Sequence, residues 1–157
     1  MKRFIITQSD KESYTSHSGL ALVGLCLNEF CSLPATAKET FPLVEGVNGI
    51  GIDDILRSSV GLLTLGQSDY EAVANHKEDE YFREALGIGK VPSAETLRQR
   101  LDEVAPALRP LVDSCSVEFL KKAGVTFTPL HTGHVPLDCD VFAMDNSKTR
   151  NERAVPQ

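Results

Sequence analysis

The residues Pro92–Glu95 form the clearest helix start in the chain, and they constrain its fold more than any other segment. Ser93 suits the N-cap because its hydroxyl can accept a hydrogen bond from a free backbone N–H, and Glu95 suits the positive end of the helix dipole. Apolar residues follow at spacings of four, three and four, on one helical face: Leu97, Leu101, Val104 and Leu108. We therefore expect an amphipathic helix that packs against a core.

Pro106 marks either a break in this helix or the first turn of the next one, because proline lacks the N–H donor that a helix interior needs. The next helix is predicted to reach about Lys122, and Gly124 to end it. Its inward residues are predicted to be Leu108, Leu111, Val112, Cys115, Phe119 and Leu120.

Apolar spacing predicts three earlier helices, at residues 18–31, 52–65 and 78–86. Asp69 can cap a further short helix that runs through Ala74. Pro34 is predicted to end the first helix. Residues 33–51 contain two prolines and three glycines, so we expect an irregular connection there.

Alternating apolar residues near the end of the chain predict strands at Val125–Leu130 and Val135–Met144, and Lys2–Gln8 could form another. Asp138 and Asp140 are two residues apart, so both carboxylates project from the same face of a strand. Buried carboxylates are costly unless they hold a cation or a partner. These two aspartates are therefore candidate ligands for Mg²⁺ or Mn²⁺, and solvated acids on an edge strand are the alternative.

The helices at residues 78–86 and 93–104 form a pair like a helix–turn–helix. The second helix presents three side chains that could reach base edges or phosphates of DNA: Arg98, Gln99 and Arg100. Glu95 and Asp102 share that outward face, so a helical hairpin with a mixed charged surface is the alternative.

Composition narrows the function classes. The chain has 157 residues and a net charge of −6, which argues against a broad, non-specific grip on nucleic acid but not against a local basic face. No apolar run approaches the roughly 20 residues that span a bilayer, so we expect a cytoplasmic protein without a membrane partner. Zinc binding is not expected, because His131, His134 and Cys139 lack a fourth ligand at a usual spacing. Buried thiols are expected at Cys26, Cys31 and Cys115.

Three segments occur in a characteristic order: Thr15–Leu20, then Tyr81–Gly87 with Val91–Leu97, then Pro136–Asp140 through Asp145–Thr149. Together they resemble the N-terminal part of a DDE-type transposase of a bacterial insertion sequence, from the group with an RNase H-like catalytic domain. The resemblance covers about residues 1–150, and the three segments in order are far more specific than any one of them.

The resemblance implies an α+β fold. A mainly helical region, residues 1–124, would help to bind the terminal repeats of the element, and residues 125–157 would begin an incomplete RNase H-like sheet. The first catalytic aspartate of the family falls on Asp140 or, as second choice, on Asp138. In the family this residue works with a later Asp and a Glu to hold two Mg²⁺ ions, which activate water and then a DNA 3′-hydroxyl for strand cleavage and transfer.

The last residues, Asn151–Gln157, do not resemble the family's continuation, and the later Asp and Glu are absent from this sequence. We therefore expect a truncated transposase that is catalytically inactive. One alternative is that the chain binds the DNA ends and competes with intact transposase. The other is a helical module that forms a homodimer through an open sheet edge and does not bind DNA.

Overall fold

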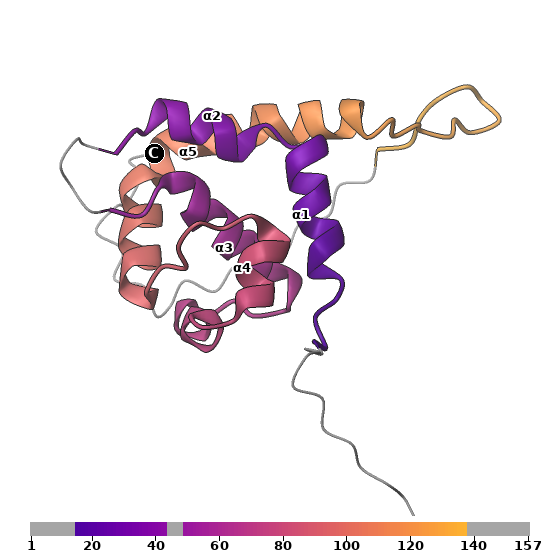
Figure 1. Ribbon diagram of the computed structural model, residues 1–157. Coiled ribbons are helices and arrows are strands. Elements are labelled where there is room, and N and C mark those ends of the chain that lie inside the picture. The colour runs from indigo at the N-terminus through magenta and orange to yellow at the C-terminus, as the bar shows by residue number, and fades with distance from the viewer. Residues whose placement is uncertain (1–14, 44–48, 138–157) are drawn as a thin grey trace, which may run out of the picture. The chain divides into compact units, whose positions relative to one another are not determined.

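The computed structural model describes residues 15–43 and 49–137. Within these ranges the chain forms helices α1 (Leu20–Glu29), α2 (Leu33–Thr40), α3 (Ile52–Thr64), the 3₁₀ helix η1 (Tyr70–His76), α4 (Glu80–Leu86) and α5 (Ala94–Lys122), as Figure 1 shows. The chain divides into two units, Met1–Val125 and Thr126–Gln157. All the helices belong to the first unit.

Helix α3 is the centre of the first unit, because it contacts each of the other helices. Asp53 and Asp54 in its first turn favour the positive end of its dipole. Its buried face supplies much of the core, with Ile52, Ile55, Leu56 and Leu62 each nearly inaccessible to solvent. The predicted helix at residues 52–65 is therefore confirmed.

Two glycines allow α4 to pack closely on its neighbours. A Cβ atom on Gly24 of α1 would overlap the carbonyl oxygen of Ala85 in α4. A Cβ atom on Gly61 of α3 would lie 2.9 Å from ring carbons of Phe82, also in α4. Helix α4 then ends at Gly87, whose φ of 66° is the left-handed conformation that glycine adopts without strain.

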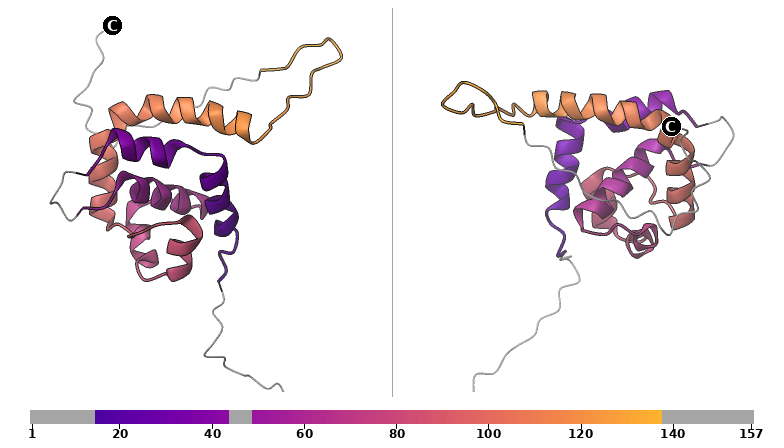
Figure 2. Two further views of the ribbon diagram at one scale, coloured as in Figure 1. Left: turned by 45° about the horizontal axis from the view of Figure 1, so that its top comes forward. Right: turned by 180° about the vertical axis from the view of Figure 1, so that it is seen from behind.

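Helix α5 begins as predicted, with the Ser93 hydroxyl accepting a hydrogen bond from the Thr96 N–H at 3.2 Å. It does not break at Pro106 but continues through both Pro106 and Pro110 to Lys122. Both views in Figure 2 show that α5 bends part-way along its length. The two prolines explain the bend, because each removes a backbone N–H donor and crowds the preceding turn. The predicted inward residues Leu97, Val104 and Leu108 are buried.

Helix α2 occupies part of the segment for which we predicted an irregular connection. Pro34 lies in its first turn, where a proline ring fits and its missing N–H costs nothing. Pro34 therefore begins a helix rather than only ending one. Among the described residues no single helix is long and apolar enough to cross a membrane; α1 and α2 pass that test only as a pair, with a 62° bend between them.

The α+β prediction is wrong for the described residues, since no strand occurs in residues 15–43 or 49–137. Gly124, with φ 67°, ends α5, and the predicted strand that follows it contains no ladder of hydrogen bonds. The Leu130 N–H instead donates to His134 O at 2.9 Å across a turn. Alternation makes a strand only where a second strand accepts its N–H groups, and the described residues offer none. Lys2–Gln8 and residues 138–144 lie outside the described ranges.

Candidate functional site

The three predicted DNA-binding side chains lie in the first turns of α5, where Arg98 and Gln99 face solvent but Arg100 is largely covered, with its Nε buried. Arg98 and Arg100 have 48% and 25% of their side-chain surface exposed. Gln99 is exposed between them. Helix α5 packs against α2, α3 and η1, whereas α4 packs against α1, α3 and η1. The candidate face of α5 is thus supported by α2, α3 and η1, and α4 contributes little to that support.

Each of these side chains is paired with a carboxylate of its own helix. Arg98 donates to Glu95 Oε1 at 2.9 Å and to Asp102 Oδ2 at 3.4 Å, and Gln99 also donates to Glu95. Arg100 donates to Glu103 Oε2 at 2.7 Å. The hydrogen bond from Arg98 holds the pKa of Glu95 below its usual value. Exposed ion pairs of this kind contribute little free energy. A DNA phosphate can therefore replace a carboxylate as the partner of an arginine at a small cost in free energy.

A second polar cluster surrounds His76, which we did not predict from the sequence. The ring is 4% exposed, with Nδ1 3.3 Å from Asp79 Oδ2 and Nε2 3.2 Å from Gln67 Oε1. It stacks on Phe82 with 4.4 Å between ring centroids. Because both ring nitrogens are occupied and solvent is excluded, the cluster ties η1 to α4 rather than presenting a reactive group. The only sign of this cluster in the sequence is an acid, Asp79, three residues after His76.

The Asp79 carboxylate makes two interactions that stabilise the fold. Its Oδ1 accepts the Phe82 N–H at 3.0 Å as the N-cap of α4, and its other oxygen faces His76. Partial burial acts to raise the pKa of Asp79, but the hydrogen bonds from Phe82 and His76 outweigh it, and the pKa lies below its usual value. The carboxylate therefore stabilises the folded state while it is charged.

We predict that Asp79→Ala lowers the free energy of unfolding by about 1–2 kcal/mol near neutral pH, the usual effect of losing an N-cap. A lowered folded-state pKa gives stability that is complete above the unfolded pKa of about 3.9 and is lost as the pH falls through the folded pKa. Urea unfolding at about pH 7 and about pH 3 should show the wild-type advantage shrinking at the lower pH. Asp69→Ala is the control, because Asp69 caps η1 without a side-chain hydrogen bond. Equal losses in both variants would contradict this role.

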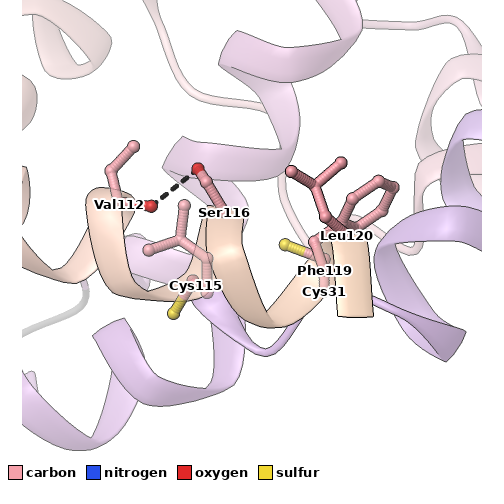
Figure 3. Close-up of a pocket in the computed structure, with 7 residues that line it drawn as sticks. Cys31, Val112, Cys115, Ser116, Phe119 and Leu120 are labelled. Carbon is pink, nitrogen blue, oxygen red and sulfur yellow. Dashed lines mark hydrogen bonds between the residues drawn. The ribbon is translucent and has the colours of Figure 1, made fainter. Parts of the chain in front are cut away.

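An apolar hollow of about 230 Å³ lies between the α1–α2 junction and the second half of α5. Figure 3 shows the thiols of Cys31 and Cys115 among its lining residues, the others being Leu33, Val112, Ser116, Phe119 and Leu120. Of the three thiols that we expected to be buried, Cys115 is buried, whereas Cys26 and Cys31 are only half-buried. Ser32 donates to Glu118 Oε2 at 2.5 Å beside the hollow and so ties α2 to α5.

The predicted metal ligands Asp138 and Asp140 lie outside the described residues, as does Cys139. His131 and His134 lie in an exposed turn of the second unit. In the part of the chain that the structure describes, no three histidine, cysteine, aspartate or glutamate side chains gather as a metal site. The Mg²⁺ prediction therefore stays a prediction.

Comparison with known protein families, with curated proteins and with solved structures finds no match to this chain. The transposase resemblance accordingly rests on the three sequence segments alone.

Proposed function

We propose that the helical unit is the DNA-end-binding part of a DDE-type insertion-sequence transposase. The observation that carries the proposal is a contact between the first two segments of the resemblance, Thr15–Leu20 and Tyr81–Leu97. The Tyr81 hydroxyl donates to the Ser18 carbonyl oxygen at 2.9 Å and so links the two segments. Phe82, Leu86 and Leu97, from the second segment, are fully buried. Residues that carry the resemblance thus form part of the core that these helices share.

The first half of α5 is the surface that we assign to DNA. A guanidinium group offers paired donors that match phosphate oxygens or the guanine edge, and an amide matches the adenine edge. Arg98 and Gln99 provide both kinds of group on adjacent exposed positions. Three carboxylates surround these groups and would repel a phosphate that does not lie beside them: Glu95, Asp102 and Glu103. A protein with a net charge of −6 would therefore bind through this local face, with a salt dependence set by the few phosphates that the face contacts.

The proposal covers binding, and not strand cleavage. In the family that the chain resembles, cleavage requires Mg²⁺ held by an aspartate that corresponds to Asp140 or Asp138. Neither residue lies in the described part of the chain. A chain that binds the ends without cutting them would compete with an intact transposase.

We predict that the double variant Arg98→Ala/Arg100→Ala binds duplexes carrying the element's terminal repeats about a hundredfold more weakly than wild type. The slope of log affinity against log salt should fall by about one for each phosphate that the variant no longer neutralises. Fluorescence anisotropy over a range of salt concentrations, with a scrambled duplex alongside, measures both quantities.

The matched control is Lys38→Ala/Lys122→Ala, which removes the same charge from other faces. Lys38 pairs with Asp53 at 2.7 Å and Lys122 with Glu118 at 2.8 Å, so both variants lose carboxylate pairs as well as charge. Equal weakening in both variants would mean that net charge alone drives binding and that α5 is not the reading surface. If wild type does not distinguish the repeats from the scrambled duplex, DNA-end binding itself is wrong.

A further inference from the structure

The second half of α5 leaves apolar side chains uncovered. Val112 and Leu120, which the apolar spacing predicts to be inward, are 37% and 44% exposed, and Val117 is 54% exposed. Packing on this half-helix centres on Cys115, which is buried, and on Phe119, which meets Phe30 edge-on with 6.2 Å between ring centroids. Val112 and Leu120 line the same hollow as these two residues, whereas Val117 lies outside it. A stripe of apolar surface thus borders the hollow shown in Figure 3.

This stripe carries a self-complementary row of charges. Asp113, Val117 and Lys121 are all exposed and follow one another at intervals of four residues, so they form one ridge along the helix. Neither Asp113 nor Lys121 forms an ion pair with any other described residue, although the adjacent Glu118 is paired with Lys122 at 2.8 Å. The ridge therefore has an acid at one end, a base at the other and an apolar residue in the middle.

We propose that a second copy of this chain docks on this face, with the two α5 helices antiparallel about a two-fold axis near Val117. In that arrangement Val117 meets its own copy, and each Asp113 meets Lys121 of the second copy. A parallel arrangement would instead place like charges together. Two-fold interfaces require a surface that complements itself, and a ridge with this order of charges does so.

The interface is small, because three turns of a helix cover less than the roughly 800 Å² per partner of a standard stable complex. Exposed apolar side chains at Val112 and Leu120 extend it toward the hollow. We therefore expect a weak dimer whose population rises with protein concentration. This dimer forms through helices and not through a sheet edge, and it does not depend on the proposed DNA binding.

Sedimentation equilibrium of the full chain under reducing conditions tests the proposal. Wild type should approach the dimer mass as concentration rises, and Val117→Asp should remain monomeric. Asp113→Lys and Lys121→Asp should each weaken the dimer about tenfold, since each introduces two like-charge contacts. The double variant Asp113→Lys/Lys121→Asp should restore the wild-type constant.

Leu63→Asp is the control, because Leu63 is a 66% exposed leucine on α3, and this variant should dimerise as wild type does. Circular dichroism checks that each variant is folded, which is expected since every substituted side chain is exposed. A double variant that stays as weak as the single ones would overturn the antiparallel arrangement. A wild-type monomer at every concentration would overturn the proposal, and would mean that another segment of the chain or another protein covers this face.

Discussion

Replacement of Gly24 by alanine is expected to lower the free energy of unfolding by about 3 kcal/mol, the upper end of the usual range for overpacking. The added methyl group would overlap the Ala85 carbonyl oxygen, which is part of the α4 backbone and cannot rotate away. Helix α1 would therefore have to move off α4, and the Tyr81–Ser18 hydrogen bond would lengthen as it did so. Urea unfolding followed by circular dichroism measures the loss.

Gly19→Ala is the matched control for Gly24→Ala. Gly19 is the N-cap of the same helix, its φ of −60° suits any residue, and a Cβ atom there would meet nothing within 4 Å. This variant should unfold within about 1 kcal/mol of wild type, or slightly above it, because alanine reduces the freedom of the unfolded chain. If both variants were equally stable, α1 would not approach α4 as closely as the structure indicates.

The sequence predicts those helices whose ends carry their own signals. Ser93 and Gly124 mark the two ends of α5 by local chemistry, so both ends are located correctly, but the break predicted at Pro106 is absent. Pro34 gives an ambiguous signal, because proline is compatible both with the end of one helix and with the first turn of the next. Alternation after Gly124 predicts a strand, but a strand also needs a partner, and the alternating pattern carries no information about one.

The ion pairs beside the candidate DNA face follow from residue spacing, because they lie within one helix. Arg98 is three residues from Glu95 and four from Asp102, and those spacings bring side chains together on any helix. The His76 cluster could not be predicted in this way. Gln67 and Phe82 approach the ring from separate parts of the chain, so their contacts with it arise only from the packing of η1 and α4.

Phe82→Ala is expected to lower the free energy of unfolding by about 3–5 kcal/mol, as is usual when a buried aromatic ring is truncated. Phe82 is fully buried, and its ring both stacks on His76 and fills the space beside Gly61. The backbone N–H that Asp79 caps is kept in the variant, so the loss reports on the ring alone. Urea unfolding near neutral pH measures it, and a loss below about 1 kcal/mol would contradict the burial of this ring.

A double-mutant cycle with Gly61→Ala tests whether Phe82 and Gly61 share the same space. Alone, the Gly61 methyl group would lie 2.9 Å from Phe82 Cε2 and Cζ and would overlap the end of the Leu86 side chain, so it should be destabilising. In the Phe82→Ala background the cavity can take up that methyl group. The double variant should therefore be more stable than the sum of the two single losses implies, by about 1 kcal/mol or more. Strict additivity would show that α3 and α4 are not in direct contact at these residues.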